Sequence, residues 1–124
     1  MDITPSIPEN LQVIDSYGPG RFQVSGTAYQ GPLLVFPRRV VAWTLTDPDG
    51  LTVESLSEVI AAEPPVEILL FGCGERMTLV KPSLRQEIRD SGIAMDPMDT
   101  GAACRTYNIL LAEGRRVAAA LVPV

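Results

Sequence analysis

The sequence predicts an α/β domain, with strands and helices alternating in its second half and an antiparallel meander in its first half. Three observations support this prediction. An apolar run from Val66 to Phe71 leads into Gly72-Cys73-Gly74, and two further alternations of helix and strand follow. In the first half, short alternations of apolar and polar residues are separated by turns rich in Gly and Pro. Apolar residues make up 46% of the chain and charged residues 20%, which is enough for a core and excludes a disordered chain.

The length of the chain indicates its domain organisation. With 124 residues it suits one domain, and we expect residues 11–124 to form a single α/β domain. Residues 1–10 are polar and include Pro5 and Pro8, which predicts a flexible N-terminal segment.

Strands and one helix are expected in the first half. The alternating or turn-bounded apolar runs each predict one strand: residues 21–29, 33–36 and 41–45. Gly18-Pro19-Gly20 supplies a turn before the first of these strands. Ser55 and Glu58 fit a capping box, which predicts that a helix opens at Ser55, and Pro64 and Pro65 end it.

The second half predicts a more regular alternation. Residues 66–71 are apolar without alternation, as expected of a strand inside a sheet that is covered on both faces. Ser83 and Gln86 fit the capping box of the next helix, and Gly92 suits its C-terminal end. Two more strands are expected, at residues 93–95 and 117–122.

A third helix is predicted between those last two strands. Asp99 or Thr100 can cap its N-terminus, and Gly114 closes it. The helix carries an apolar stripe that faces the sheet, formed by Ala103, Tyr107, Leu110 and Leu111.

Charge and hydropathy narrow the classes of partner. Ten basic against 15 acidic side chains give a net charge of −5, which repels a phosphate backbone and argues against nucleic acid binding. No stretch approaches the ~20 apolar residues needed to span a bilayer, and residues 1–5 lack the features of a signal peptide. The simplest location is a bacterial-type cytoplasm, with contact to the inner membrane through partners left open.

The chemistry-bearing residue types also exclude several mechanisms. The chain has no histidine, which excludes Ser-His, Cys-His and histidine–metal chemistry. Cys73 and Cys104 match no metal or redox spacing. No cofactor or metal is therefore expected.

A candidate ligand site lies where the strand of residues 66–71 ends. Gly72 and Gly74 would let a ligand approach the backbone, and the following amides with Arg76 would offer an anion site. The simpler interpretation is that glycine allows a tight exit from a buried strand. Cys73 would lie exposed at this sheet edge as a candidate nucleophile or redox group, and Arg76 would lower the pKa of its thiol. No histidine is present to act as its base.

Polar residues of the third helix extend this candidate site. Thr100, Thr106 and Asn108 would form a pocket wall that faces residues 72–74. Alternatively, Asn108 hydrogen-bonds a neighbouring segment and holds the helix in place. Asp96 and Asp99 could be paired carboxylates or a weak metal site, but a turn with a helix cap explains them more simply.

Motifs in four separate regions agree in order and spacing with one small family. These motifs are Val66 to Gly74, Gly92 to Asp96, Asp99 to Asn108, and Glu113-Gly114-Arg115 with Ala118 to Pro123. The similarity extends back through Ser25-Gly26 and Val41-Ala42-Trp43 to about Asp15. On these residues the chain resembles the formerly uncharacterised domain family that includes a mitochondrial respiratory complex I assembly factor and an adipogenesis-associated protein.

The resemblance implies both a fold and a role. The fold would be a compact three-layer α/β domain with a mixed central sheet and an added antiparallel element. The role of the mitochondrial relative is to assemble a membrane-bound NADH:quinone oxidoreductase rather than to catalyse a reaction.

Two function classes follow from these observations. The favoured one is a non-catalytic interaction or assembly module whose partners are proteins, among them respiratory-complex or membrane-assembly proteins. The alternative is a small-molecule or anion-binding protein, or an enzyme, that uses the edge from Gly72 to Arg76 together with Thr100 and Asn108.

Overall fold

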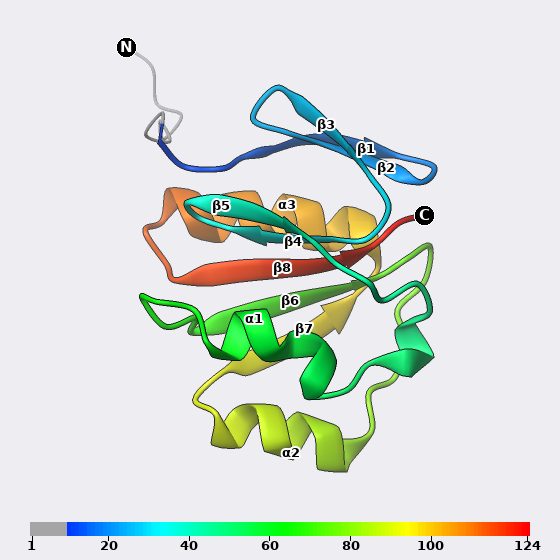
Figure 1. Ribbon diagram of the computed structural model, residues 1–124, viewed down its shortest axis with the longest axis vertical. Coiled ribbons are helices and arrows are strands. Elements are labelled where there is room, and N and C mark those ends of the chain that lie inside the picture. Colours follow the sequence, from blue (N-terminus) through cyan, green and yellow to red (C-terminus); the bar gives the residue numbers. More distant parts are fainter. Residues whose placement is uncertain (1–9) are drawn as a thin grey trace.

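The computed structural model describes residues 10–124, so the flexible segment expected over residues 1–10 lies outside the described residues except for Asn10. The elements form three layers around a central sheet (Figure 1). Helix α3 (Thr100–Ala112) covers one face, and α1 (Ser57–Ile60) and α2 (Pro82–Asp90) cover the other. The predicted α/β class, with a mixed central sheet and an added antiparallel element, is confirmed.

The central sheet combines a parallel half with an antiparallel half. Its strand order is β5-β4-β8-β6-β7, with β4 Leu33–Phe36, β5 Arg39–Ala42, β6 Ile68–Cys73, β7 Ala94–Met98 and β8 Val117–Val122. Strand β6 is parallel to both of its neighbours, whereas β4 is antiparallel to both β8 and β5. The prediction that β6 lies inside the sheet is confirmed, and β8 takes the middle position because the chain returns past β6 through α3.

Both faces of the sheet are buried along β4, β6 and β8, which explains the unalternating apolar runs there. In β6, Leu69 and Phe71 join the core under α1 and α2, whereas Leu70 joins the core under α3. All six residues of β8 are buried, and its middle residues, Ala118 to Ala120, are small. Small side chains on this strand let helices approach the sheet closely on both faces.

A second sheet lies beyond α3 and consists of three antiparallel strands (Figure 1). Its strands are β1 Ile14–Gly18, β2 Arg21–Val24 and β3 Thr27–Gln30. Phe22 and Val24 are buried in the core that α3 shares with the central sheet. The meander predicted for the first half is thus divided, because β4 and β5 belong to the central sheet instead.

The strand predicted over residues 21–29 was wrong in one respect. The chain reverses at Ser25 and Gly26, whose φ angles are 47° and 82°, and so forms a hairpin rather than one strand. Positive φ at both central residues is the geometry of the tight two-residue hairpin turn. Strand β1 was not predicted, because its sequence, Ile14 to Gly18, has only its two end residues buried.

Helix boundaries also differ from the predicted caps. The reciprocal cap before α1 joins Thr52 and Ser55, whose side chains accept from each other's backbone N–H at 3.0 and 3.1 Å. The predicted box of Ser55 and Glu58 is therefore placed three residues too late. Helix α2 begins with Pro82 and has no side-chain cap, so the box of Ser83 and Gln86 was also wrong.

Other predicted boundaries agree closely with the structure. Asp99 caps α3 by accepting from the backbone N–H of Ala102 at 2.9 Å. Gly92 follows α2 with a φ of 86°, the left-handed conformation expected after a helix end. Strand β5 ends before Trp43, whose indole N–H instead donates to the carbonyl oxygen of Ser55 at 2.7 Å.

Candidate functional site

The carboxyl end of β6 lies directly against the first turn of α3. The backbone N–H of Gly74 donates to the Thr100 hydroxyl at 2.8 Å, and that hydroxyl donates to the carbonyl oxygen of Val122 at 2.6 Å. The backbone N–H of Thr100 donates in turn to the carbonyl oxygen of Gly74 at 2.8 Å. Thr100 is fully buried and thereby joins β6, α3 and the end of β8. We call the group formed by Gly72, Cys73, Gly74 and Thr100 the glycine edge.

Gly72 is required by this close packing. A Cβ atom at this position would lie 3.0 Å from the Thr100 hydroxyl oxygen and 3.0 Å from a methyl carbon of Leu121. These contacts are tighter than those that side chains normally make, so the first turn of α3 approaches the strand only because residue 72 has no side chain. Within residues 10–124, the protein's own groups approach the backbone at Gly72. The simpler interpretation instead concerned the exit from the strand, where Gly74 has a φ of 96°.

Both thiols are buried. The Cys73 thiol donates to the carbonyl oxygen of Phe71 at 3.6 Å, and burial raises its pKa above the ordinary value. This direction is opposite to the one that activation by Arg76 would produce. Cys104 lies in the core under α3, where burial raises its pKa to about 12. Both groups are therefore held as neutral thiols near neutral pH.

The remaining polar residues of the candidate site lie around the glycine edge rather than inside it. Arg76 is exposed on the segment between β6 and α2, and Asp96 is exposed on β7. Asp99 acts as the helix cap that the simpler interpretation predicted. Within residues 10–124, no cluster of acidic and cysteine side chains has the arrangement of a metal site.

Asn108 makes a different long-range contact. Its side-chain amide donates to the carbonyl oxygen of Ile14 at 2.8 Å, and its amide oxygen accepts from the backbone N–H of Ile14 at 3.0 Å. The neighbouring Tyr107 hydroxyl donates to the carbonyl oxygen of Gln12 at 2.9 Å. The amide thus binds the edge of β1 as another strand would, and attaches the N-terminal sheet to α3.

The structure brings together only part of the predicted site. Gly72, Cys73, Gly74 and Thr100 are adjacent, whereas Asn108 follows Thr100 by eight residues, about 12 Å along the helix axis. A ligand-binding role for the edge from Gly72 to Arg76 stays a prediction.

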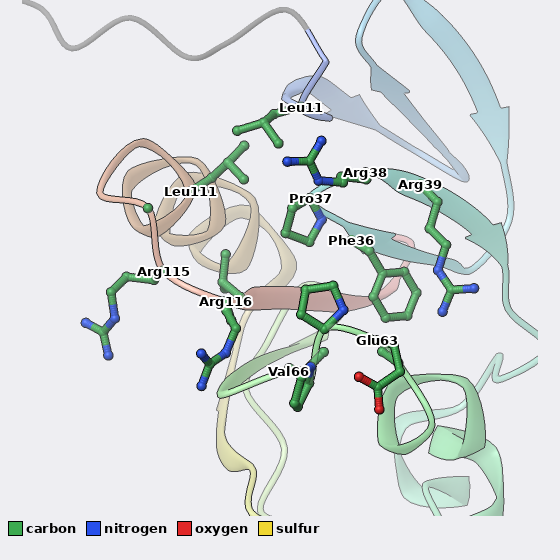
Figure 2. Close-up of a pocket in the computed structure, with 15 residues that line it drawn as sticks. Leu11, Phe36, Pro37, Arg38, Arg39, Glu63, Val66, Leu111, Arg115 and Arg116 are labelled. Carbon is green, nitrogen blue, oxygen red and sulfur yellow. The ribbon is translucent and has the colours of Figure 1, made fainter.

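A cavity of about 320 Å³ opens at the other end of the central sheet, where β6 and β8 begin (Figure 2). Its lining is mostly apolar and includes the buried residues Phe36, Val66 and Leu111, with Pro64 and Pro65 exposed at the mouth. We call this hollow the arginine cavity, because Arg38, Arg39, Arg115 and Arg116 also line it.

The arginines of this cavity differ in their ion pairs. Arg115 pairs with Glu67 at 2.6 Å, and its hydrogen bond and charge lower the pKa of Glu67. Arg116 lies 3.6 Å from the other oxygen of the same carboxylate. Arg39 lies 3.6 Å from Glu58 and also stacks over the ring of Phe36 at 4.3 Å. Within residues 10–124, the structure shows no ion pair for Arg38.

Sequence reasoning missed this cavity. The only signal for it is the pair of Arg-Arg dipeptides, at residues 38–39 and 115–116, each next to the end of a predicted strand. Four segments that are distant in the sequence form the walls, so no local motif marks the site.

Comparison with known proteins identifies related chains. The model of the family described as "Protein of unknown function (DUF498/DUF598)" matches residues 14–122. NADH dehydrogenase [ubiquinone] 1 alpha subcomplex assembly factor 3 of Danio rerio is 38% identical over 111 residues, which are 90% of this chain and 64% of that protein. An uncharacterized protein of Rhodobacter capsulatus is also 38% identical over 111 residues, which are 90% of this chain and 84% of that protein.

Solved structures share the fold. A crystal structure of a protein from Bordetella parapertussis has a TM-score of 0.84 and 35% identity, and the match covers 92% of this chain and 97% of that one. A crystal structure described as an outer membrane protein from Bartonella henselae has the same TM-score and identity, with 96% and 99% covered. Among the helices at residues 10–124, none has the length and apolar character that a membrane crossing needs.

Proposed function

The chain belongs to the DUF498/DUF598 family, and from this membership we propose that it is a non-catalytic module for the assembly of a membrane-bound NADH:quinone oxidoreductase. The observation that carries the proposal is the similarity to assembly factor 3, which extends over 90% of this chain. The chain spans only about three fifths of the length of the curated assembly factors that it matches. The proposal therefore concerns the interaction domain that these proteins share with it.

The glycine edge supports a structural role. The Thr100 hydroxyl donates to the carbonyl oxygen of Val122 and accepts from the backbone N–H of Gly74, so both of its hydrogen bonds stabilise the fold. The Cys73 thiol is buried, and its raised pKa makes it a weak nucleophile at neutral pH. A thiol reagent should therefore label native Cys73 far more slowly than the unfolded chain, whereas rapid native labelling would support a redox or catalytic role.

The segment between β6 and α2 offers an apolar surface for a protein partner. Met77 is 55% exposed and Leu79 is 84% exposed, although both side chains are large and apolar. Exposed apolar side chains that lie together mark interaction sites more often than isolated ones do. We propose that Met77 and Leu79 contact a protein partner.

A quantitative pull-down tests the assembly role. The tagged protein is captured from gently solubilised native cells, and bound proteins are compared with an untagged control by mass spectrometry. Reproducible enrichment of respiratory-complex subunits or membrane-assembly factors is expected. If no respiratory-complex subunit or membrane-assembly factor is enriched above the untagged control, the proposal is wrong.

Variants of the apolar surface make the same experiment more specific. Leu79→Ser and Met77→Ser should reduce the recovery of the partner at least fivefold without changing the melting temperature. Ile109→Ser is the matched control, because Ile109 is 59% exposed on a different element, α3. If all three variants reduce the recovery of the partner equally, Met77 and Leu79 do not form a specific contact surface.

The proposed location follows from the proposed role. We place the protein in the cytoplasm, at the inner membrane through its partners. Cell fractionation should recover a part of the protein with the membranes, and Leu79→Ser should reduce that part, since the proposed partner contact is apolar. Recovery in the periplasm or the outer membrane would contradict this location.

A further inference from the structure

The arginine cavity has two features that together describe a ligand. Its floor is apolar, and positively charged guanidinium groups lie around that floor (Figure 2). We propose that the cavity binds a small amphipathic carboxylate, whose apolar body lies on the floor and whose carboxylate pairs with Arg38. This inference goes beyond the proposed assembly role and does not depend on it.

The floor is suited to an apolar body of limited size. Phe36 and Val66 belong to the core under α1 and α2, and Leu111 belongs to the core under α3. They are 4%, 6% and 3% exposed, so the floor is formed by the ends of two packed cores. A volume of about 320 Å³ lies at the lower end of the range of ligand pockets. At roughly 30 Å³ for each water-sized group, the cavity holds about ten non-hydrogen atoms. A carboxylate with a body of about seven carbons would therefore fill it.

The ion pairs decide which arginine binds the carboxylate. Arg115 pairs with Glu67 at 2.6 Å, and Arg39 stacks over the Phe36 ring at 4.3 Å, with only a loose ion pair to Glu58. Arg38 has no ion pair among the described residues, and its side chain lies beside Leu11 and Pro37 at the cavity (Figure 2). A guanidinium group binds a carboxylate through two parallel hydrogen bonds, which gives it an advantage over a point charge.

The other charges at the cavity make the binding selective rather than merely electrostatic. Glu58, Glu63 and Glu67 offset part of the positive charge, so a general attraction for anions is weak here. Arg116 is loosely paired at 3.6 Å and lies on the side of the floor away from Arg38 (Figure 2). It should contribute less than Arg38, through its charge alone. Both the apolar body and the carboxylate are then needed for binding.

Nuclear magnetic resonance titrations of the full chain test the proposal with three probes. Sodium octanoate has ten non-hydrogen atoms, octanol has the tail without the charge, and inorganic phosphate has charge without a tail. We expect saturable binding of octanoate, at least tenfold tighter than that of either other probe. The shifted amide signals should belong to the residues around Phe36, Val66 and Leu111.

Arginine variants assign the carboxylate to its partner. Arg38→Ala should weaken octanoate binding at least tenfold, and Arg116→Ala about threefold. Arg85→Ala is the matched control, since Arg85 is an exposed arginine on α2 outside both candidate sites, and it should leave the affinity unchanged. All three side chains are exposed, so the variants should fold normally, which a melting curve checks.

Several results would overturn the inference. If octanol binds as tightly as octanoate, the cavity is only a nonspecific apolar pocket. If phosphate binds as tightly as octanoate, the arginines form only a nonspecific anion-binding patch. Signals that shift at residues 72–79 instead, with weaker binding in Arg76→Ala, would transfer the site to the glycine edge. Binding of an acidic tripeptide with a central tryptophan, but not of octanoate, would assign the cavity to a partner protein. These outcomes are separate from the pull-down, which tests the assembly role.

Discussion

The two ends of the parallel strands β6 and β8 differ in how they are filled. At the carboxyl end, the Thr100 hydroxyl and the first turn of α3 occupy the space that Gly72 leaves. At the amino end, four segments surround a cavity of about 320 Å³ with an apolar floor and four arginines. A glycine-rich strand exit therefore marks a close approach to the backbone, but it does not identify the group that approaches. Here the approaching group belongs to the protein itself.

The largest loss of stability is expected when Thr100, which closes the carboxyl end of β6 and β8, loses its hydroxyl group. Thr100→Val keeps the shape of the side chain but leaves the Gly74 N–H and the Val122 carbonyl without their partner. Since each of these two unsatisfied buried polar groups costs about 1–3 kcal/mol, the free energy of unfolding should fall by about 2–6 kcal/mol. Urea unfolding measures this loss.

The control for this prediction is a second threonine on the same helix. Thr106→Val changes a half-buried side chain for which residues 10–124 show no hydrogen bond, and should cost much less. Thr100→Ser should retain most of the stability because it keeps the hydroxyl. Equal losses in Thr100→Val and Thr106→Val would mean that the closed end is not held by these hydrogen bonds.

The next effect comes from adding one methyl group to the closed end. Gly72→Ala would place a Cβ 3.0 Å from the Thr100 hydroxyl oxygen and 3.1 Å from the Thr100 Cα. Overpacking of this kind should lower the free energy of unfolding by about 1–3 kcal/mol. Thermal unfolding followed by circular dichroism measures it.

Gly50→Ala is the matched control for the added methyl group. Its Cβ would meet only the end of the Leu45 side chain, at 3.2 Å, which can move away. We expect a change within about 0.5 kcal/mol. A Gly72→Ala protein as stable as this control would show that the edge has room for a ligand, as the alternative function requires.

A smaller and more local effect is expected from Asn108. Asn108→Ala removes both hydrogen bonds to Ile14, which should cost about 1–2 kcal/mol. Hydrogen exchange should show faster exchange in β1 and β2, while β6 and β8 keep their protection. Gln86→Ala, which removes an exposed hydrogen bond to Asp90, is the control. Uniform acceleration across both sheets would contradict the view that Asn108 acts as a local attachment.

The smallest effect is expected from the ion pair at the open end. Arg115 lowers the pKa of Glu67 below 4.5, so the pair stabilises the folded protein above that pH. This stabilisation is lost as the pH falls through the lowered folded-state pKa. Glu67→Gln should therefore reduce the melting temperature slightly at neutral pH and not at all well below 4.5. A difference that persists in acid would mean that Glu67 acts through packing rather than charge.

Local patterns in the sequence determined most of the fold. The apolar runs at β6 and β8, the Asp99 cap and the glycine after α2 all depend on neighbouring residues, and the structure agrees with them. The hairpin at Ser25 and Gly26 was missed although its signal is also local. Ala28 continues the period-two alternation of Phe22 and Val24 in the sequence, which hid the turn. In the structure Ala28 is exposed and pairs with Gln23, so the reversal places it on the opposite face of the hairpin.

The tertiary structure decided what lies at each end of the sheet. Thr100 contacts Gly74 from 26 residues away, and Asn108 contacts Ile14 across 94 residues. The arginine cavity likewise exists only where four distant segments fail to fill the space between them. Periodicity, helix caps and turns depend on sterics and hydrogen bonds between neighbouring residues, so the sequence alone determines them. Whether a strand end is closed or hollow depends on which distant side chains arrive there, and only the packed fold determines that.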